Sequence, residues 1–311
     1  MNHIQIPKLV KDGVVLGFLM VKSAEGKKTS TGKTYIDLVL MNKTGSIPAK
    51  YWGDATLPNA GDILDVNAIV NEFNGKLQLR LEAIVLAPSD VDKGEFLPYS
   101  PRPAEEMLQE VLATIMEFQD KELQQLTSEL IGEAGDKFKV FPAAKQMHHA
   151  EIGGLLHHIT SMLNLAKGIA SNYPELNKDL LLAGVIIHDL GKLQEMARNE
   201  LGLVTDYTVE GKLVGHIVSG AINIERAGRK LGISENTIML MQHMVLSHHG
   251  EPEFGSAQRP LIPEAEVLST IDRLDARMFE MFEALREIPV GSFSARVWAL
   301  DNRELYKARE F

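Results

Sequence analysis

The spacing of apolar residues changes once along this chain, and that change limits which folds are open to it. Residues 12–87 carry short runs of apolar and β-branched residues, such as GVVLGFLMVKS and DILDVNAIVNEF, which are typical of strands. From Ala104 onward, apolar residues recur at the three- and four-residue intervals of amphipathic helices. The proline-rich stretch PYSPRP indicates a linker at about 96–103. We therefore expect two domains with separate cores, an all-β domain followed by an all-α domain.

The N-terminal domain, residues 1–95, is predicted to be a small five-stranded barrel of the OB-fold type. The turn signals NKTG at 42–45 and Asn74-Gly75 separate its strands, and Asn-Gly is a strong hairpin signal. Such barrels often bind single-stranded nucleic acid by stacking bases on aromatic side chains. Alternation along the strands would place part of these side chains in the core instead. The candidates for the binding face are Phe18, Lys33, Tyr35, Lys50, Trp52, Phe73 and Arg80, of which Tyr35 and Trp52 are favoured.

The C-terminal domain, residues 96–311, is predicted to be an all-α helical bundle. LLLAGVII, at 180–187, is apolar on every side and indicates a buried central helix. The first expected helix has an apolar stripe that can pack internally or mediate a homo-oligomer. The expected helices lie near 104–131, 150–171, 178–198, 209–231, 234–249 and 264–287.

Charge and composition limit the partners and the location of the protein. The net charge of −10 lies wholly beyond residue 95, because residues 1–95 carry 11 basic and 11 acidic side chains. An acidic surface attracts phosphate backbones poorly, although the neutral first domain can still present a local basic face. The absence of cysteine excludes disulfides and thiolate metal ligands. Since no apolar run approaches roughly 18 residues and no signal-peptide pattern is present, we expect a cytoplasmic protein with no membrane partner.

Histidine is concentrated in one part of the chain, with nine of the ten residues between 148 and 249. His188-Asp189 ends the central apolar run, where burying an unpartnered aspartate costs several kcal/mol. Taken alone, such a dipeptide is more often a satisfied core histidine beside a surface aspartate. Facing helices of a bundle can nevertheless bring distant segments together into a metal site. The other candidate segments are GGLLHHITSML, VGHIVSG, LSHHG and STIDRLDA.

The chemistry of these side chains suits divalent transition metals. Imidazoles and carboxylates without thiols favour Mn, Fe, Zn, Ni or Co. Seven potential ligands are more than one tetrahedral zinc ion can bind. They suit two octahedral ions whose remaining coordination positions are filled by water. The order H…HD…H…HH…D resembles the dinuclear form of the HD-domain phosphohydrolase superfamily. This resemblance implies that His158, His188, Asp189 and Asp272 hold one ion, that His216, His248 and His249 complete the second, and that Asp189 bridges both.

Two choices within the segments also come from the resemblance. His158 is preferred to His157, which stands where the family has an acidic residue and is kept as an alternate ligand. Asp272 is preferred to Asp275 because it aligns with the leading aspartate of the family's D-R-L-D segment. Asp275, one turn further on, is expected to support a ligand from behind.

Further residues are candidates for catalytic roles beside Asp189. Two ions would lower the pKa of a bound water and neutralise charge on a phosphoryl group. Lys192, four residues after His188, would meet a phosphate oxygen if the helix continues, and would otherwise be a solvated lysine. His148 and His149 lie about ten residues before the first ligand segment and are assigned to substrate contact or proton delivery. A capping or core role is their alternative.

The two domains together indicate the function more specifically than either domain does alone. An OB-like domain followed by an HD domain, with FPAAKQMHHAEIGGLLHH between them, resembles the YhaM-type 3′–5′ exoribonucleases over nearly the whole chain. The resemblance implies an exonuclease that hydrolyses single-stranded RNA or DNA to nucleoside 5′-monophosphates. It would use two divalent ions, with Mn favoured and Fe, Co or Ni as alternatives. The competing hypotheses are a phosphohydrolase of small cyclic or triphosphorylated nucleotides and a non-catalytic nucleic-acid adaptor.

Overall fold

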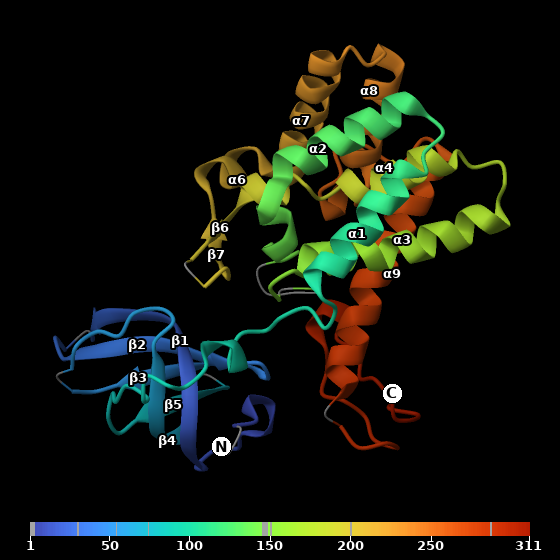
Figure 1. Ribbon diagram of the computed structural model, residues 1–311. Helices are drawn as coiled ribbons and strands as arrows, with labels where there is room; N and C mark the ends of the chain where they lie inside the picture. The colour runs from blue at the N-terminus through green and yellow to red at the C-terminus, as the bar shows by residue number, and fades with distance from the viewer. Residues whose placement is uncertain are drawn as a thin grey trace. The chain divides into compact units, whose positions relative to one another are not determined.

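The computed structural model describes residues 4–29, 31–53, 55–73, 75–144, 149, 151–199, 201–286 and 288–311. The chain divides into two compact units (Figure 1). The first consists of Met1–Tyr99 with Asn199–Leu201, and the second of Ser100–Arg198 with Gly202–Phe311. Among the described residues, no helix is long and apolar enough to cross a membrane.

The first unit is a closed five-stranded barrel with the strand order β1-β2-β3-β5-β4. All neighbouring strands are antiparallel except β3 and β5, which are parallel. This topology is that of the OB-fold. A register shift between Val21 and Ser23 bends β1, so that its first half pairs with β4 and its second half with β2. The strands are β1 (Val14–Lys28), β2 (Thr34–Asn42), β3 (Gly45–Tyr51), β4 (Ile63–Phe73) and β5 (Lys76–Leu81).

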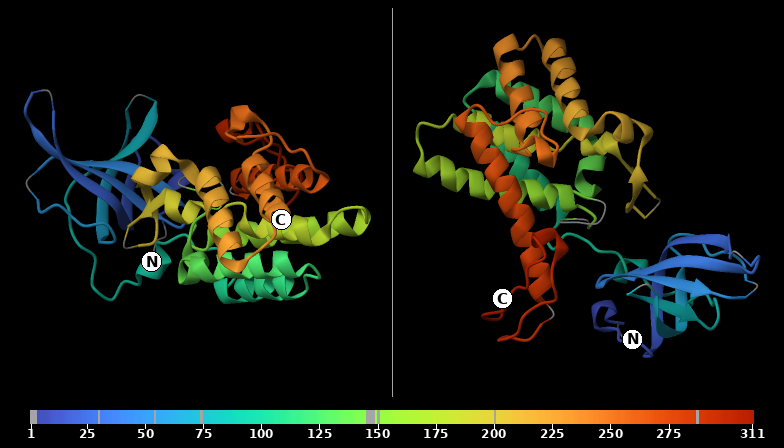
Figure 2. Two further views of the ribbon diagram at one scale, coloured as in Figure 1. Left: turned by 90° about the horizontal axis from the view of Figure 1, so that it is seen from above. Right: turned by 180° about the vertical axis from the view of Figure 1, so that it is seen from behind.

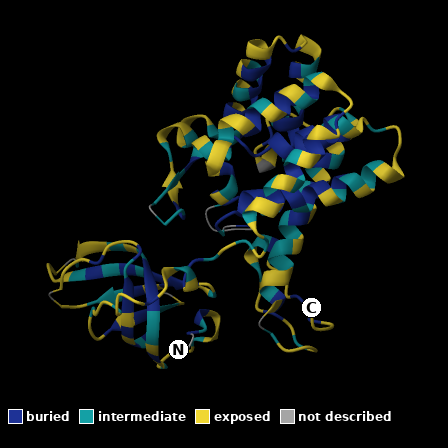
Figure 3. Ribbon diagram, in the orientation of Figure 1, coloured by how far each residue is buried: buried dark blue, intermediate teal, exposed yellow. Residues whose placement is uncertain are grey.

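The second unit is the predicted helical bundle. All eight residues of the central run 180–187 are buried, as their uniform apolarity predicted. Buried residues follow the inward faces of the barrel strands and of the bundle helices (Figure 3). The helices are α1 (Ala104–Met116), α2 (Lys121–Val140), α3 (Gly154–Asn172), α4 (Lys178–Ile187), α5 (Lys192–Glu195), α6 (Val209–Leu213), α7 (Gly215–Leu231), α8 (Glu235–Ser247) and α9 (Pro263–Arg286).

Three of the expected helices are interrupted, so their predicted extents were wrong. The helix expected at 104–131 stops at Met116, and a new helix begins after Asp120. The helix expected at 178–198 stops at Ile187 and gives way to a turn, the short α5 and a strand. The helix expected at 209–231 breaks before Gly215, whose φ of 77° favours glycine. Periodicity missed these breaks because the apolar spacing continues across them.

Two small features of the helical unit have no helical period at all. A hairpin of β6 (Met196–Arg198) and β7 (Val204–Tyr207) interrupts the bundle. Residues 288–311 fold back along the C-terminal half of α9 (Figure 2). There Leu300 and Leu305 form a small apolar cluster with Leu285.

Asp120 is expected to set the break between α1 and α2. Its Oδ1 accepts hydrogen bonds from the backbone N–H groups of Glu122 and Leu123, at 2.9 and 3.1 Å. Asp120→Ala should therefore lower the free energy of unfolding of the helical unit by about 1 kcal/mol, the usual cost of losing an N-cap. Denaturant unfolding followed by circular dichroism measures this change. Asp120→Asn retains the cap and should remain close to wild type, whereas equal losses in both variants would contradict the capping role.

Candidate metal centre

Two of the predicted ligands, His188 and His248, end their helices in the same way. They are the C-caps of α4 and α8, and neither side chain is exposed. In each ring, Nδ1–H donates to the carbonyl three residues earlier, Val185 at 2.9 Å and Val245 at 2.7 Å. A neutral imidazole that donates through Nδ1 keeps a lone pair on Nε2. In both rings Nε2 is therefore the nitrogen that points away from its own helix, where it can bind a metal ion.

His158 and His216 are oriented by carboxylates instead of backbone carbonyls. His158, on α3, donates from Nδ1 to Asp275 Oδ2 at 2.7 Å. His216, at the start of α7, donates to Glu195 Oε1 at 2.9 Å, and its backbone N–H donates to the same oxygen at 3.1 Å. Such carboxylate–histidine pairs fix the orientation of a ligating ring and raise its basicity. Asp275 was expected in this supporting position, whereas Glu195 was not predicted, because nothing in the sequence distinguishes it from other glutamates.

The four Nε2 atoms converge on the Asp189 carboxylate. Its Oδ2 lies 3.3 Å from His188 Nε2 and 4.0 Å from His158 Nε2. Its Oδ1 lies 3.6 Å from His216 Nε2 and 3.7 Å from His248 Nε2. The two oxygens of one carboxylate thus face two different pairs of histidines.

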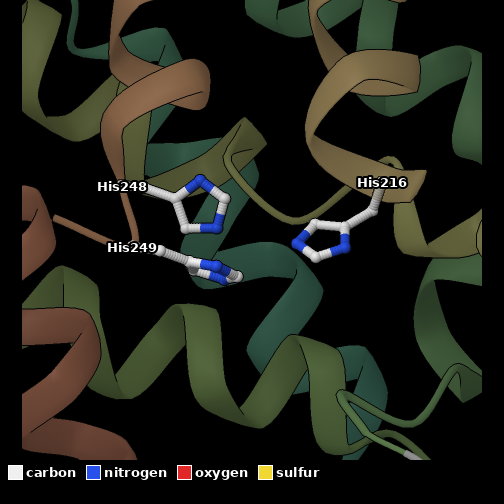
Figure 4. Close-up of side chains that lie close together, drawn as sticks. All are labelled: His216, His248 and His249. Atoms are coloured by element: carbon white, nitrogen blue, oxygen red, sulfur yellow. The ribbon is translucent and has the colours of Figure 1, made fainter. Parts of the chain in front are cut away.

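Asp272 and His249 complete the set of seven. Asp272 Oδ1 lies 3.2 Å from His158 Nε2. The ring centroid of His249 is 4.3 Å from that of His248 and 5.4 Å from that of His216, and Figure 4 shows these three rings turned toward a common space. The ligand atoms form three overlapping groups, each within 4.8 Å: His158, His188 and Asp189; His188, His248 and Asp272; and His216, His248 and His249.

Several buried polar atoms of this cluster have no hydrogen-bond partner among the described residues. They are His188 Nε2, His216 Nε2, His248 Nε2 and Asp189 Oδ1. A buried acceptor without a partner costs about 1–3 kcal/mol, so several such atoms in one place need an explanation. Ligand atoms bound to one ion at about 2.0–2.2 Å lie roughly 3.0–3.5 Å apart, close to the separations in this cluster. The residues therefore fit divalent metal ions.

Lys192 ion-pairs with Asp189 and is not the solvated lysine that the sequence left open. Its Nζ lies 2.7 Å from Asp189 Oδ2, and both side chains are almost fully buried. Burial alone would raise the pKa of Asp189, but the charge of Lys192 outweighs it and holds that pKa well below its ordinary value. The backbone between the two residues is a turn, since α4 ends at Ile187.

The remaining ligands differ in how readily they lose a proton. Burial, with the neighbouring charges of His188 and His249, lowers the pKa of His248 well below its ordinary value. Burial also lowers that of His158, but hydrogen bonds to Asp272 and Asp275 outweigh it and raise its pKa to about 9. His248 is therefore neutral, whereas an ion bound at His158 replaces a proton.

Gly191 permits the close approach of α7 to the Asp189 turn. Its φ of −59° is accessible to any residue, so the backbone conformation does not require glycine. A Cβ at this position would instead lie 2.1 Å from the carbonyl oxygen of His216. Glycine at this position is thus a packing requirement that holds two ligand segments together.

The other histidines of the first segment lie apart from this centre. His157 Nδ1 contacts Glu151 Oε1 and His149 Nδ1, each at 3.1 Å, and belongs to none of the three groups. His149 is buried, with Nε2 3.0 Å from Asp275 Oδ2. Burial would raise the pKa of Glu151, but hydrogen bonds with both histidines lower it to about 2. His148, also predicted as a site residue, lies outside the described residues.

In the barrel, the structure brings together four of the predicted binding residues. The rings of Tyr35 and Trp52 stack with centroids 4.7 Å apart. Lys50 Nζ lies 4.6 Å from the Tyr35 centroid, and Lys33 Nζ lies 5.5 Å from that of Trp52. Tyr35 also lines a cavity of about 690 Å³ beside the β1–β2 hairpin. A half-buried tyrosine stacked on an exposed tryptophan and flanked by lysines can stack bases and hold phosphates.

The other three barrel candidates lie elsewhere along the strands. Phe18 is opposite Asp65, in the half of β1 that pairs with β4. Phe73 ends β4 and pairs with Lys76, at the start of β5. Trp52 instead follows the end of β3, which pairs with β5 in parallel. Arg80 is opposite Lys50 in that parallel pair, and its guanidinium lies 3.5 Å from Glu82. Phe18 and Phe73 are therefore separate from the Tyr35–Trp52 stack.

The bundle and its histidine–aspartate centre define an HD-domain protein, and the HD domain family model matches residues 155–277. The chain is 41% identical over 297 residues to the 3′–5′ exoribonuclease YhaM of Geobacillus sp. (strain WCH70), covering 93% of this chain and 90% of that protein. It is 39% identical over 296 residues to that of Bacillus subtilis (strain 168), covering 93% of this chain. The chain therefore belongs to the YhaM family of 3′–5′ exoribonucleases.

Solved structures similar to this chain match the barrel region. One is the second OB-fold domain of replication protein A from Methanococcus maripaludis, which is 20% identical. The match covers 29% of this chain and 98% of that domain, with a TM-score of 0.24.

Gly191→Ala is expected to disturb the metal centre through the His216 backbone. Because the new Cβ has no room beside the His216 carbonyl, the free energy of unfolding should fall by roughly 1–3 kcal/mol, and metal affinity should fall with it. Denaturant unfolding and chelator competition measure the two effects. Gly168→Ala on α3 is the matched control, since its Cβ would meet no atom within 4 Å and should stabilise by about 0.5–1 kcal/mol. Equal behaviour of the two variants would contradict the packing requirement.

Proposed function

We propose that this protein is a metal-dependent 3′–5′ exoribonuclease that removes nucleoside 5′-monophosphates from single-stranded RNA or DNA. The observation that carries the proposal is the Asp189 carboxylate, which is buried with each oxygen facing a separate pair of histidine Nε2 atoms. Membership of the YhaM family, whose curated relatives are named as 3′–5′ exoribonucleases, supports the strand as substrate. The cytoplasmic location expected from the sequence is part of this proposal.

The seven clustered residues would hold two divalent ions, for which Mn is favoured. His158, His188 and Asp272 would bind one, His216, His248 and His249 the other, and Asp189 both. When bound, such ions lower the pKa of a water molecule into the neutral range and neutralise charge on the scissile phosphate. The protein's own part is orientation, because every ring supported through Nδ1 can present only Nε2 to the centre.

Lys192 and His149 would assist this centre from two sides. Lys192 balances the charge of Asp189, and its ammonium would lie close to a phosphate oxygen bound beside the centre. His149 donates to Asp275, which in turn orients His158, so it acts as a positioning residue or in proton delivery. His148 keeps its predicted contact with substrate as part of the proposal.

The barrel would hold the strand whose 3′ end is cut. Stacking of bases on Tyr35 and Trp52, with phosphates near Lys33 and Lys50, suits single strands of any sequence, because every base has a face to stack. Arg80, next to Lys50 across the parallel pair, extends this basic edge. Phe18 and Phe73 would contact only a longer nucleic-acid strand that continues past the Tyr35–Trp52 stack.

Asp189→Ala is expected to abolish cleavage while strand binding survives, because both groups of ligands lose their shared carboxylate. Mn-loaded protein is given RNA labelled at the 5′ or the 3′ end, and products are resolved by length. Wild type should shorten the 5′-labelled strand progressively and release the 3′ label as a mononucleotide. Chelation of the metal should stop both reactions.

Two further variants control this experiment. Asp189→Asn keeps the shape of the buried side chain and should be equally inactive, which separates chemistry from misfolding. Asp206→Asn removes an exposed aspartate that pairs with Lys212 and should cleave like wild type. Undiminished cleavage by the Asp189 variants, or no shortening from the 3′ end by wild type, would refute the proposal.

Trp52→Ala is expected to weaken binding of a short oligonucleotide by roughly 5- to 150-fold, since one base–aromatic stack is worth about 1–3 kcal/mol. Fluorescence anisotropy with the uncleaving Asp189→Asn background measures the dissociation constant. Phe73→Ala is the matched control, because this aromatic residue is also exposed, 62% against 40% for Trp52, but lies away from the stack. Equal losses in the two variants would show that the Tyr35–Trp52 stack is not the binding face.

A further inference from the structure

A second histidine–carboxylate cluster lies outside the seven-residue centre. It consists of His149, Glu151 and His157 and is called the outer triad here. The two Nδ1 atoms are 3.1 Å apart, and Glu151 Oε1 lies 3.1 Å from His157 Nδ1 and 3.4 Å from His149 Nδ1. Three ligand atoms thus form a nearly equilateral triangle between the loop before α3 and the first turn of that helix.

The backbone at His149, which holds one corner of this triangle, has an energetically unfavourable conformation. His149 has a φ of 52°, in the left-handed region that side chains other than glycine rarely adopt. Its carbonyl accepts from Ala143 N–H at 2.9 Å and packs so closely on Gly154 that a Cβ there would lie 2.0 Å away. Backbone strain of about 1–3 kcal/mol persists where the surroundings enforce it, and it is concentrated at functional sites.

The hydrogen bonds around His149 leave its Nδ1 as an acceptor. His149 Nε2 lies 3.0 Å from Asp275 Oδ2, the oxygen that also accepts from His158 Nδ1. A carboxylate that accepts both bonds requires the His149 proton on Nε2. The lone pair of a neutral His149 ring therefore points into the triangle.

The donor atoms and spacing of the outer triad match a transition-metal site. The donors are two imidazole nitrogens and one carboxylate oxygen, and the side chains of His149 and Glu151 are almost fully buried. Separations of 3.1–3.4 Å are those of ligands at about 2.0–2.1 Å from a tetrahedral ion. The partly exposed ring of His157 leaves one side of the triangle open for a fourth ligand from solvent.

We propose that His149 Nδ1, His157 Nδ1 and Glu151 Oε1 bind a third divalent transition-metal ion, of which Zn²⁺ fits the donor set best. This site is distinct from the seven-residue centre but is joined to it through Asp275, which accepts from His149 on one side and from His158 on the other. An ion in the outer triad would lock the loop before α3 and so fix the support of His158. The proposal does not depend on the exonuclease activity. The competing explanation is that no metal binds and that a proton on His157 is shared with His149 and Glu151.

The test is the metal content of the full-length protein. Metal-stripped wild type, Glu151→Gln and His157→Ala are reloaded with Zn²⁺ and desalted, and zinc per chain is measured by mass spectrometry. Wild type should hold one ion more than either variant. Crystals of the zinc-loaded wild type should give an anomalous difference peak between the three side chains, and that peak should be absent from Glu151→Gln.

His243→Ala is the matched control, because its ring accepts from the Leu261 backbone N–H and takes part in neither cluster. It should retain the wild-type zinc content. Glu151→Gln preserves size, so the proposal stays testable if His157→Ala fails to fold. Equal zinc in wild type and both triad variants, or an anomalous map with no peak at the outer triad, would overturn the proposal in favour of the shared proton.

Discussion

The arrangement of the helical unit depends on the burial of one carboxylate, that of Asp189. An aspartate that follows a run of eight buried apolar residues is costly unless positive charge or hydrogen-bond donors surround it. The structure places Lys192 against one oxygen and directs histidine nitrogens at both. Much of the bundle serves this arrangement: α4 carries Asp189 inward, and Gly191 lets α7 close over the turn. The metal ions proposed for the site would complete the compensation that Lys192 alone provides only in part.

Much of the fold was accessible from the sequence, because strands and helices differ in the period of their apolar residues. Runs of apolar and β-branched residues between turn signals predicted the barrel strands, and the uniform apolarity of 180–187 predicted the central helix. The hairpin β6–β7 was missed because strands of three and four residues are too short to show a period. The break before α2 was missed for a different reason. It depends on capping by Asp120, which leaves the surrounding apolar pattern unchanged.

The order of the seven ligands along the chain predicted that they lie close together. It did not predict the residues that orient their rings. Glu195 lies 21 residues from His216, and only tertiary structure brings them together. The same limit applies to the barrel, where cross-strand register decides which aromatic side chains meet. Tyr35 and Trp52 stack because Ile36 pairs with Tyr51, whereas Phe18 pairs with a different strand. Adjacent histidines on α3 also have separate environments, since consecutive helical residues point about 100° apart.

The supports of the ligand rings divide into two kinds with different consequences for how the site tolerates change. His188 and His248 are oriented by carbonyls three residues away, so any helix that ends there presents them correctly. His158 depends on Asp275, 117 residues distant, and His216 on Glu195 across a hairpin. Two of these four histidines are therefore oriented by local contacts, and two only by the finished fold. Each proposed ion would have one histidine of each kind. A substitution that loosens the packing of α7 or α9 would therefore misorient His216 or His158 and weaken the binding of one ion, while the locally oriented histidine of that ion stays in place.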